Sequence, residues 1–380
     1  VCFNSTVVQR TIRRIKSKLS AGPDGIPSLV LKKLGPHLAD SLTMLFKSFL
    51  SVGKVPTEWK TAIILPLYKK GCAADCSNYR PIALTCTVCK IMERIIASEM
   101  INYLRKYGVI SQQQHGFLSR RSTVTNLIET LNDWTIALKH RHLITSVFID
   151  YSKAFDVVNH NKLLYKLSML GISGDLLTWI TNFLTDRSQV TRVGQSVSES
   201  VAVKSGVIQG SCLGPILFIL YINDVVSAVG TDVQCKLYAD DIKLYTVIHS
   251  NDDHLILQNT LDELKRWSDS WQLNISISKC AVFNVGRIST VQYSESDSNN
   301  LRFDYHLGDT VLAAETTVRD LGVLTDSSLN YGSHINQIRS KALRRIGLLF
   351  KCFQTRDTSV LLKAYTTYVR PIAEYATCVW

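Results

Sequence analysis

Apolar residues recur along this 380-residue chain at two different spacings, and the change between them predicts a mixture of helices and strands. Residues 123–139 carry apolar side chains four, three and four positions apart, which is the spacing of one helix face. The run LITSVFID at 143–150 is short and rich in β-branched residues, so we predict a buried strand. Because strands and helices follow one another without regular alternation, we expect an α+β fold rather than a doubly wound α/β fold.

Four further stretches have helical patterns. Residues 7–19 are amphipathic, with Ile12, Ile15 and Leu19 on one face, and residues 255–273 repeat apolar positions in the same way. The stretch 214–229 is apolar on nearly every side, which predicts a helix in the core. An apolar stripe over 338–353 predicts a helix near the C-terminus. The most polar segment, SESDSNN at 294–300, is predicted to be a linker.

Two adjacent carboxylates stand at the centre of a strand pattern. In CKLYADDIKLYTV, Asp240 and Asp241 are flanked by apolar and β-branched residues, which predicts two strands joined by a tight turn. Two like charges in such a hairpin repel each other and lose hydration, and a bound cation would relieve both effects. Adjacent aspartates are common in chains of this length, so the pair alone does not identify a metal site.

A third carboxylate makes the metal hypothesis stronger. Asp150 ends the apolar strand 143–150 as Asp240 ends CKLYA, so the three side chains can meet if the two strands are neighbours in one sheet. Carboxylate oxygens are the ligands that Mg²⁺ prefers. Such a cluster can hold two ions roughly 4 Å apart, which activate an attacking hydroxyl and stabilise a leaving oxygen in phosphoryl transfer.

The amino-acid composition indicates what kind of protein this is and what kind of partner it binds. With 46% apolar and 19% charged residues, the chain resembles an ordinary globular protein rather than a disordered one. It has 43 Lys and Arg against 31 Asp and Glu, a formal charge of +12 that favours a polyanionic partner such as nucleic acid. The longest apolar run, 212–222, is too short to cross a bilayer, so no membrane partner is expected. Ten scattered cysteines without a signal-peptide pattern indicate a reduced, intracellular setting.

Two more stretches have the features of a phosphate or nucleotide site. Lys69 and Lys70 in AIILPLYKKG and Arg80 in NYRPIAL lie on segments predicted to be extended, where they can meet phosphate. Gln209, Gly210 and Ser211 form a loop before the predicted core helix, and its glycine allows the backbone to approach a ligand closely.

The cysteine spacing suggests zinc at first sight. Cys72, Cys76, Cys86 and Cys89 form two close pairs. The intervening NYRPIAL is better explained as an extended strand, and the pairs lack the usual glycines, so no zinc site is expected.

Taken in order, ten stretches resemble the reverse transcriptases of non-LTR (LINE-type) retrotransposons over nearly the whole chain. They are AGPDGIP, WKTAIILPLYKKG, NYRPIAL, QHGFLSRRST, FIDYSKAFDVVNH, GVIQGSCLGPILFILYIND, YADDIKLY, WQLNISISKC, LGVLTD and YVRPIAEYATCVW. The resemblance implies a right-hand polymerase fold with fingers, a palm built on an antiparallel sheet, and a helical thumb. It divides the chain into an N-terminal helical extension (1–19), fingers and palm (20–285), a linker with the primer-grip hairpin (286–329) and the thumb (330–380).

The resemblance also assigns catalytic roles. Asp150 matches the metal-binding aspartate of motif A, and Asp240 with Asp241 matches motif C, so two Mg²⁺ ions, or Mn²⁺ in their place, are implied. Lys279 matches the motif D lysine that protonates the departing pyrophosphate. Phe155 falls at the position whose ring excludes a 2′-hydroxyl and so selects deoxynucleotides. Its neighbour Asp156 is expected to hydrogen-bond backbone in the following turn rather than to bind metal.

Further roles concern the nucleotide and the nucleic acid. Gln209, Gly210 and Ser211 match the motif B loop beside the incoming nucleotide, and Lys69 and Arg80 match the contacts to its triphosphate. Leu321 and Gly322 resemble the turn of the primer-grip hairpin. The basic residues expected to follow the phosphates of the duplex are Arg339, Lys341, Arg344 and Arg345.

The implied activity is RNA-directed DNA synthesis from an RNA template, a DNA primer and dNTPs, copying at a target site in the nucleus as a ribonucleoprotein. Two alternatives remain: a nucleic-acid-binding remnant without activity, and a group II intron-type or RNA-dependent RNA polymerase. Because the chain begins at Val1 and stops abruptly, we expect a fragment of a longer polypeptide, with any nicking endonuclease in a separate domain. The oligomeric state is left open.

Overall fold

The computed structural model describes residues 1–286 and 303–380, so the predicted linker at 294–300 lies outside the described residues. The described chain forms two compact units, and it passes between them several times. The first unit contains Val1–Ser111, Ser152–Asp224 and Ser268–Asn274. The second contains Gln112–Tyr151, Val225–Trp267 and Ile275–Trp380.

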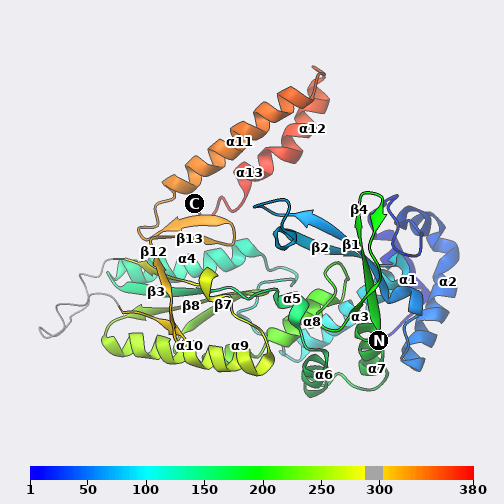
Figure 1. Ribbon diagram of the computed structural model, residues 1–380, viewed down its shortest axis with the longest axis horizontal. Helices are drawn as coiled ribbons and strands as arrows, with labels where there is room; N and C mark the ends of the chain where they lie inside the picture. Colours follow the sequence, from blue (N-terminus) through cyan, green and yellow to red (C-terminus); the bar gives the residue numbers. More distant parts are fainter. Residues whose placement is uncertain (287–302) are drawn as a thin grey trace, which may run out of the picture. The chain divides into compact units, whose positions relative to one another are not determined.

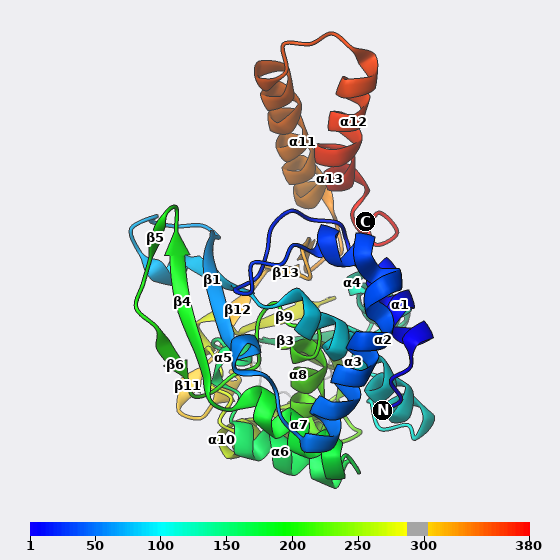
Figure 2. The same ribbon diagram turned by 90° about the vertical axis from the view of Figure 1, so that its right-hand side faces the viewer.

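The first unit is built on a five-stranded sheet. Its long strands are β1 (Thr61–Tyr68), β2 (Tyr79–Leu84) and β4 (Arg187–Val193), with β1 between the other two. β1 and β2 form an antiparallel hairpin, whereas β4 runs parallel to β1, and Figure 2 shows β1 and β4 side by side. Two short strands, β5 (Ser196–Val197) and β6 (Val201–Val203), pair with β4.

Helices make up most of the rest of the first unit. They are α1 (Ser5–Arg13), α2 (Ser28–Val52), α3 (Thr87–Lys106), α5 (Ala154–Val157), α6 (His160–Met169), α7 (Gly174–Leu184) and α8 (Gly214–Ile222). The sequence prediction of a core helix is confirmed for α8, because nearly all of its side chains are buried. The helix predicted over 214–229 is, however, two helices, with α9 (Val225–Val229) following a break.

The helix predicted over 7–19 is also shorter than expected. α1 ends at Arg13, and Leu19 is 80% exposed. The backbone beyond the helix is bonded to the start of α2, because the Ser28 hydroxyl donates to Lys16 O and accepts the N–H of Lys18. These tertiary hydrogen bonds replace the ones that a longer helix would have made.

The second unit is built on a sheet whose central strand is buried. The strand order is β12 (Ala313–Glu315), β9 (Ala281–Val285), β3 (Leu143–Ile149), β8 (Asp241–Ile248) and β7 (Gln234–Tyr238). β3 is antiparallel to both of its neighbours, and it confirms the buried strand predicted for 143–150. In Figure 1, α4 (Thr123–Lys139) and α10 (Asn251–Trp271) cover opposite faces of this sheet.

Smaller elements complete the second unit. β10 (His306–Leu307) pairs with β11 (Thr310–Val311), and β13 (Thr317–Asp320) forms a hairpin with β14 (Val323–Asp326). The C-terminal helices are α11 (Gly332–Cys352), α12 (Thr358–Tyr368) and α13 (Arg370–Glu374). Among the described residues, no helix is both long and apolar enough to cross a membrane. Together the two units confirm the α+β class expected from the sequence.

Candidate active site

The sheet of the second unit brings two of the predicted carboxylates to one edge. β3 and β8 are antiparallel neighbours, and their last aligned pair at this end is Ile149 with Ile242. The next residues, Asp150 and Asp241, therefore face each other across the two strands. Residues opposite each other in an antiparallel pair have Cβ atoms roughly 4.5–5.5 Å apart and point to the same side of the sheet.

The third carboxylate lies in the adjoining turn. Tyr238 pairs with Asp241, so Ala239 and Asp240 are the two central residues of the β7–β8 hairpin. Ala239 has a φ of +59°, a conformation that residues other than glycine rarely adopt. Strain of this kind costs about 1–3 kcal/mol and persists only where the surrounding structure holds it. The backbone of this turn is therefore maintained by its contacts with the surrounding chain.

Electrostatics at this edge favour a cation. Burial raises the pKa of Asp240, and the charge of Asp150 raises it further. The pKa of Asp241 is raised to about 7, first by burial and then by the charges of Asp240, Asp150 and Asp320. The ionised forms of Asp240 and Asp241 are thus disfavoured, and a divalent ion bound beside them would relieve this.

The carboxylate of Asp150 already has a positive partner. Lys279 ends a 3₁₀ turn (Ile277–Lys279), and its Nζ donates to Asp150 Oδ1 at 3.0 Å. The backbone oxygen of Asp150 accepts the N–H of Ser276 at 2.8 Å, which ties this turn to the end of β3. Lys279 and Asp150 thus meet, although 129 positions separate them in the sequence.

The three carboxylates share an edge but do not converge on one point. Within residues 1–286 and 303–380, no group of three or more Asp, Glu, His or Cys side chains is arranged so that it could hold a metal ion as it stands. The three side chains nevertheless fit Mg²⁺ chemically, since carboxylate oxygens are the ligands it prefers. The raised pKa values of Asp240 and Asp241 also favour a bound cation. Gathering these oxygens on an ion requires the side chains to rotate toward one another.

In the first unit, the β1–β2 hairpin presents two cations on one face. Leu67 pairs with Arg80, and the N–H of Lys69 donates to Asn78 O at 2.8 Å, so the pairing continues past the strand end. Side chains two positions apart on a strand share a face, which places Lys69 and Arg80 together. Both are exposed.

The loop before α8 is held by backbone contacts. Gln209 O accepts the N–H of Ala83 at 2.8 Å, and Ser211 Oγ accepts the N–H of Gly214 at 2.7 Å. Gly210 has a φ of +128°, and a Cβ there would lie 2.3 Å from Ala83 O. Only glycine therefore fits at this position.

Asp156 contacts this loop in a way that the sequence analysis did not expect. Its carboxylate accepts the side-chain N–H of Gln209 at 2.8 Å, instead of bonding backbone in the following turn as predicted. Burial raises the pKa of Asp156, while this hydrogen bond and the charges of Lys153 and Lys69 lower it. Together with β1 and β2 residues, Asp156 and Gln209 line a cavity of about 70 Å³.

A second carboxylate, which the sequence analysis missed, binds the backbone where this loop joins α8. Glu93 of α3 is fully buried, and its Oε2 accepts the N–H groups of Cys212 (2.6 Å) and Leu213 (3.1 Å) at the start of α8. A sequence signal existed, because Glu93 lies four positions after Cys89 on the apolar face of its helix. An acid in that place needs buried hydrogen-bond donors.

The ring of Phe155 is stacked on a core side chain. Its centroid lies 4.1 Å from that of Phe218, with an angle of 16° between the planes. The backbone oxygen of Phe155 accepts the N–H of Val207 at 2.8 Å, which connects it to the loop that carries Gln209. The ring is half-buried and is fixed in position by these contacts.

Leu321 and Gly322 form the tight hairpin turn expected from the sequence. They lie between the paired residues Asp320 and Val323, with φ values of +42° and +97°. Positive φ at both central residues is the requirement of a type I′ turn. The Tyr375 hydroxyl donates to Leu321 O at 2.6 Å, so the C-terminal segment supports this turn.

The basic residues predicted to meet the duplex lie on one helix. α11 carries them on its exposed surface: Arg339, Lys341, Arg344 and Arg345.

Comparisons with known proteins agree with the resemblance drawn from the sequence. A family model described as reverse transcriptase (RNA-dependent DNA polymerase) matches residues 67–324. The RNA-directed DNA polymerase from mobile element jockey of Drosophila melanogaster is 28% identical over 87% of this chain and 36% of its own length. Two further Drosophila melanogaster relatives are the probable RNA-directed DNA polymerases from transposon BS (27%; 98% of this chain, 42% of the relative) and from transposon X-element (25%; 100% and 41%). The chain thus spans about two fifths of the length of these relatives.

Proposed function

Because the chain belongs to the reverse transcriptase (RNA-dependent DNA polymerase) family, we propose that it extends a DNA primer with dNTPs on an RNA template, as a non-LTR retrotransposon polymerase does. The observation that carries the proposal is the strand register that sets Asp150 opposite Asp241, with Asp240 in the adjoining turn. In this interpretation the first unit supplies the fingers, and the second supplies the palm sheet and a thumb built from α11, α12 and α13.

Asp150, Asp240 and Asp241 are the residues that would hold Mg²⁺, or Mn²⁺ in its place. Divalent ions bound there supply charge that activates the primer hydroxyl and stabilises the leaving oxygen. Lys279, which contacts Asp150, is placed to hold a proton at Nζ for the departing pyrophosphate. The Lys279 side chain is more than half exposed, so a substrate can reach it.

The remaining residues bind and orient the substrates. Lys69 and Arg80, on one face of the β1–β2 hairpin, bind the triphosphate, for which the forked Arg side chain suits two oxygens at once. Phe155 closes the space that a 2′-hydroxyl would need. The loop of Gln209, Gly210 and Ser211 lies beside the base, and its backbone is fixed by Ala83 and Gly214.

The primer and duplex are held by the second unit in this proposal. The turn of Leu321 and Gly322 supports the primer end, and the cations of α11 follow the duplex phosphates. Copying at a chromosomal target requires an intracellular, nuclear location with the template RNA bound, and we propose that location for this protein.

Primer extension tests this function. The purified chain is given an RNA template annealed to a DNA primer, with Mg²⁺ and dNTPs, and is compared with Asp240→Asn. We expect incorporation that falls at least 100-fold in the variant, while the affinity for template–primer changes less than twofold. If the intact chain binds template–primer without extending it, it is a binding remnant. Equal use of ribonucleotides and dNTPs indicates an RNA polymerase instead.

A further inference from the structure

The catalytic hairpin has an additional backbone partner that lies far away in the sequence. β7 lies at one edge of the sheet of the second unit, and the segment 112–117 runs alongside it. The N–H of Leu237 donates to Gln113 O at 3.0 Å, and the N–H of His115 donates to Leu237 O at 2.8 Å. The pairing is parallel and centred on Gln114, so this segment ends beside the turn that carries Asp240 and Asp241.

The side chain of Gln114 reaches that turn. It is fully buried, and its Oε1 accepts two backbone N–H groups, from Ala239 at 2.9 Å and from Gly116 at 2.6 Å. Ala239 is the residue with the unfavourable φ of +59°. The bond from Gln114 thus holds the one residue of the turn that would otherwise relax. Among the described residues, Gln114 Nε2 has no hydrogen-bond partner, so only the oxygen has a visible role.

The backbone at Gly116 approaches the same turn so closely that no side chain fits. A Cβ at this position would lie 2.5 Å from Ala239 N and 2.9 Å from Gln114 Oε1. The clash at Ala239 is with backbone, which cannot move aside without moving the turn. Gly116 and Gln114 therefore constrain Ala239 through two separate features, close contact and a hydrogen bond.

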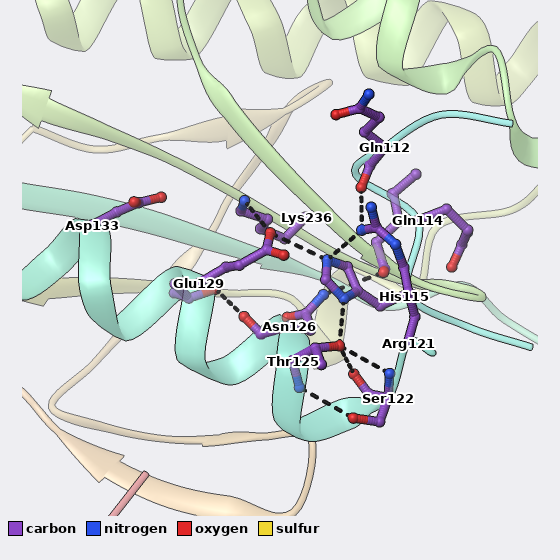
Figure 3. A network of polar contacts seen from close by, with 12 residues as sticks. Gln112, Gln114, His115, Arg121, Ser122, Thr125, Asn126, Glu129, Asp133 and Lys236 are labelled. Atoms are coloured by element: carbon purple, nitrogen blue, oxygen red, sulfur yellow. Dashed lines mark hydrogen bonds and ion pairs between the residues drawn. The ribbon is translucent and has the colours of Figure 1, made fainter. Parts of the chain in front are cut away.

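A polar network around His115 fixes the segment to α4 (Figure 3). His115 is 1% exposed; its Nδ1 lies 2.8 Å from Thr125 Oγ1, and its Nε2 lies 3.1 Å from Arg121 Nη1 and 3.3 Å from Glu129 Oε2. The Glu129 carboxylate also accepts from Lys236 of β7 at 2.8 Å. The segment that carries Gln114 is thereby tied both to α4 and to β7.

We propose that Gln114 is a positioning residue for catalysis: by accepting the N–H of Ala239 it sets the backbone of the β7–β8 turn, and so the direction in which Asp240 and Asp241 project. Gln114 contacts no reacting atom in this arrangement. The inference rests on the proposed function, since it assigns the turn a task in holding divalent ions.

The test compares Gln114→Met with a matched control. Methionine keeps the length of the side chain and removes the accepting oxygen. Asn126→Leu removes another buried amide, which donates to Leu237 O of β7 at 3.2 Å but does not touch the turn. Both variants lose a buried hydrogen bond to the same hairpin, and only one loses the contact with Ala239.

Two readouts are measured on the full chain. The first is Mn²⁺ affinity, followed by electron paramagnetic resonance without substrates. The second is the rate of primer extension in a single turnover, measured over a series of Mg²⁺ concentrations. This rate is divided by the fraction of protein molecules that bind template–primer. We expect Gln114→Met to weaken Mn²⁺ binding at least threefold and to lower the maximal rate at least tenfold, with template–primer affinity unchanged within twofold. Asn126→Leu is expected to stay within twofold of the parent in both readouts, although its melting temperature falls.

The outcomes separate this inference from the proposed function. Equal Mn²⁺ affinity and rate in Gln114→Met and Asn126→Leu overturn the role of Gln114. A parent chain that binds template–primer but does not extend it overturns the proposed function, and the Mn²⁺ titration then still decides the role of Gln114. If Gln114→Met binds no template–primer, Gly116→Ala replaces it, and the same losses are expected because its Cβ displaces Ala239.

Discussion

At the scale of single residues, the fold decides the ionisation of the carboxylates on which the proposed chemistry depends. Asp241 keeps an exposed surface, but most of its surroundings are protein, and Asp240, Asp150 and Asp320 add negative charge. These effects raise its pKa to about 7. Because folding disfavours the ionised form of Asp241, a bound cation that neutralises its charge would stabilise the folded protein.

Replacement of Asp241 by Asn should therefore stabilise the metal-free protein. The unfolded carboxyl has a pKa of about 3.9, so between pH 4 and 7 the folded state binds more protons and the free energy of unfolding falls as the pH rises. Asp241→Asn removes this dependence. In EDTA it should be more stable than the parent at pH 8, with a difference that shrinks toward pH 4. Urea unfolding at both pH values measures this, and saturating Mg²⁺ should reverse the order at pH 8. Parallel pH profiles for parent and variant would contradict the account.

Replacement of Phe155 by Val tests the proposed exclusion of ribonucleotides. The Phe155 ring is held by stacking on Phe218, and valine is too short to fill the same space. The preference for dNTPs over rNTPs, measured as a ratio of kcat/KM, should fall at least tenfold. Phe155→Tyr keeps the ring and should retain the preference within threefold. Unchanged discrimination in Phe155→Val would remove Phe155 from this role.

At the scale of elements, a buried ion pair ties the hairpin of β13 and β14 to β8. Lys243 lies two positions after Asp241 on β8, and its ammonium is bonded to the carboxylate of Asp320 at the end of β13. Both side chains are less than 10% exposed. The turn of Leu321 and Gly322 begins at the next residue, so this pair fixes its register against β8.

Breaking this pair from one side should destabilise the fold strongly. Lys243→Met leaves the Asp320 carboxylate buried without its cation, which costs about 3–5 kcal/mol of unfolding free energy. The double variant Lys243→Met/Asp320→Leu should recover most of that loss, because no charge stays buried. Urea unfolding of the three proteins measures both effects.

An exposed pair provides the control for that series. Arg266 Nη2 and Glu263 Oε1 of α10 lie 2.6 Å apart, and both side chains are at least half exposed. Arg266→Ala should therefore lower the free energy of unfolding by less than about 1 kcal/mol.

The double variant provides the contradicting outcome for the buried pair. If Lys243→Met/Asp320→Leu is as unstable as Lys243→Met alone, the pair contributes more to stability than compensation of charge.

The elements also show how far the sequence can predict this structure. The helix over 123–139 has the predicted bounds, because its apolar period agrees with a local capping box at Ser122. The helix predicted over 7–19 stops early, since hydrogen bonds to Ser28 compete with it. The spacing of apolar residues within 7–19 does not show that Ser28 will bond the backbone of Lys16 and Lys18.

The same reasoning applies to the candidate site. The placement of Asp150, Asp240 and Asp241 at one edge of the sheet could be predicted from sequence, because each lies where an apolar strand ends or begins. The contact of Gln114 with Ala239 and that of Glu93 with Cys212 could not be assigned, because in each case the backbone N–H group that donates lies more than 100 positions away. The contact between Lys279 and Asp150 depends on the tertiary fold in the same way.

At the scale of the whole molecule, the net charge of +12 suits a protein that holds a polyanion. Part of that charge is arranged along α11, whose cations Arg339, Lys341, Arg344 and Arg345 are exposed. Phosphate contacts of this kind release counterions and make binding dependent on salt.

Charge reversal on α11 should flatten the salt dependence of template–primer binding. Each lost phosphate contact reduces the slope of log K against log salt by about 1, so Arg344→Glu/Arg345→Glu should reduce it by about 2. Arg10→Glu/Arg13→Glu on α1 makes the same change in net charge and should leave the slope within about 0.5 of the parent. Fluorescence anisotropy over a series of salt concentrations measures this, and equal slopes in the two variants would place the duplex elsewhere.

The proposed function requires Asp150, Asp240 and Asp241 to bind divalent metal together, and cleavage by bound iron tests this directly. Fe²⁺ replaces Mg²⁺, and ascorbate with peroxide then generates radicals that cut the polypeptide next to the metal. We expect cuts in two separate parts of the chain, one near Asp150 and one near Asp240 and Asp241. Excess Mg²⁺ should suppress both cuts, and so should Asp150→Asn. Cuts near only one of the two strands, or at a different part of the chain, would contradict the shared metal site.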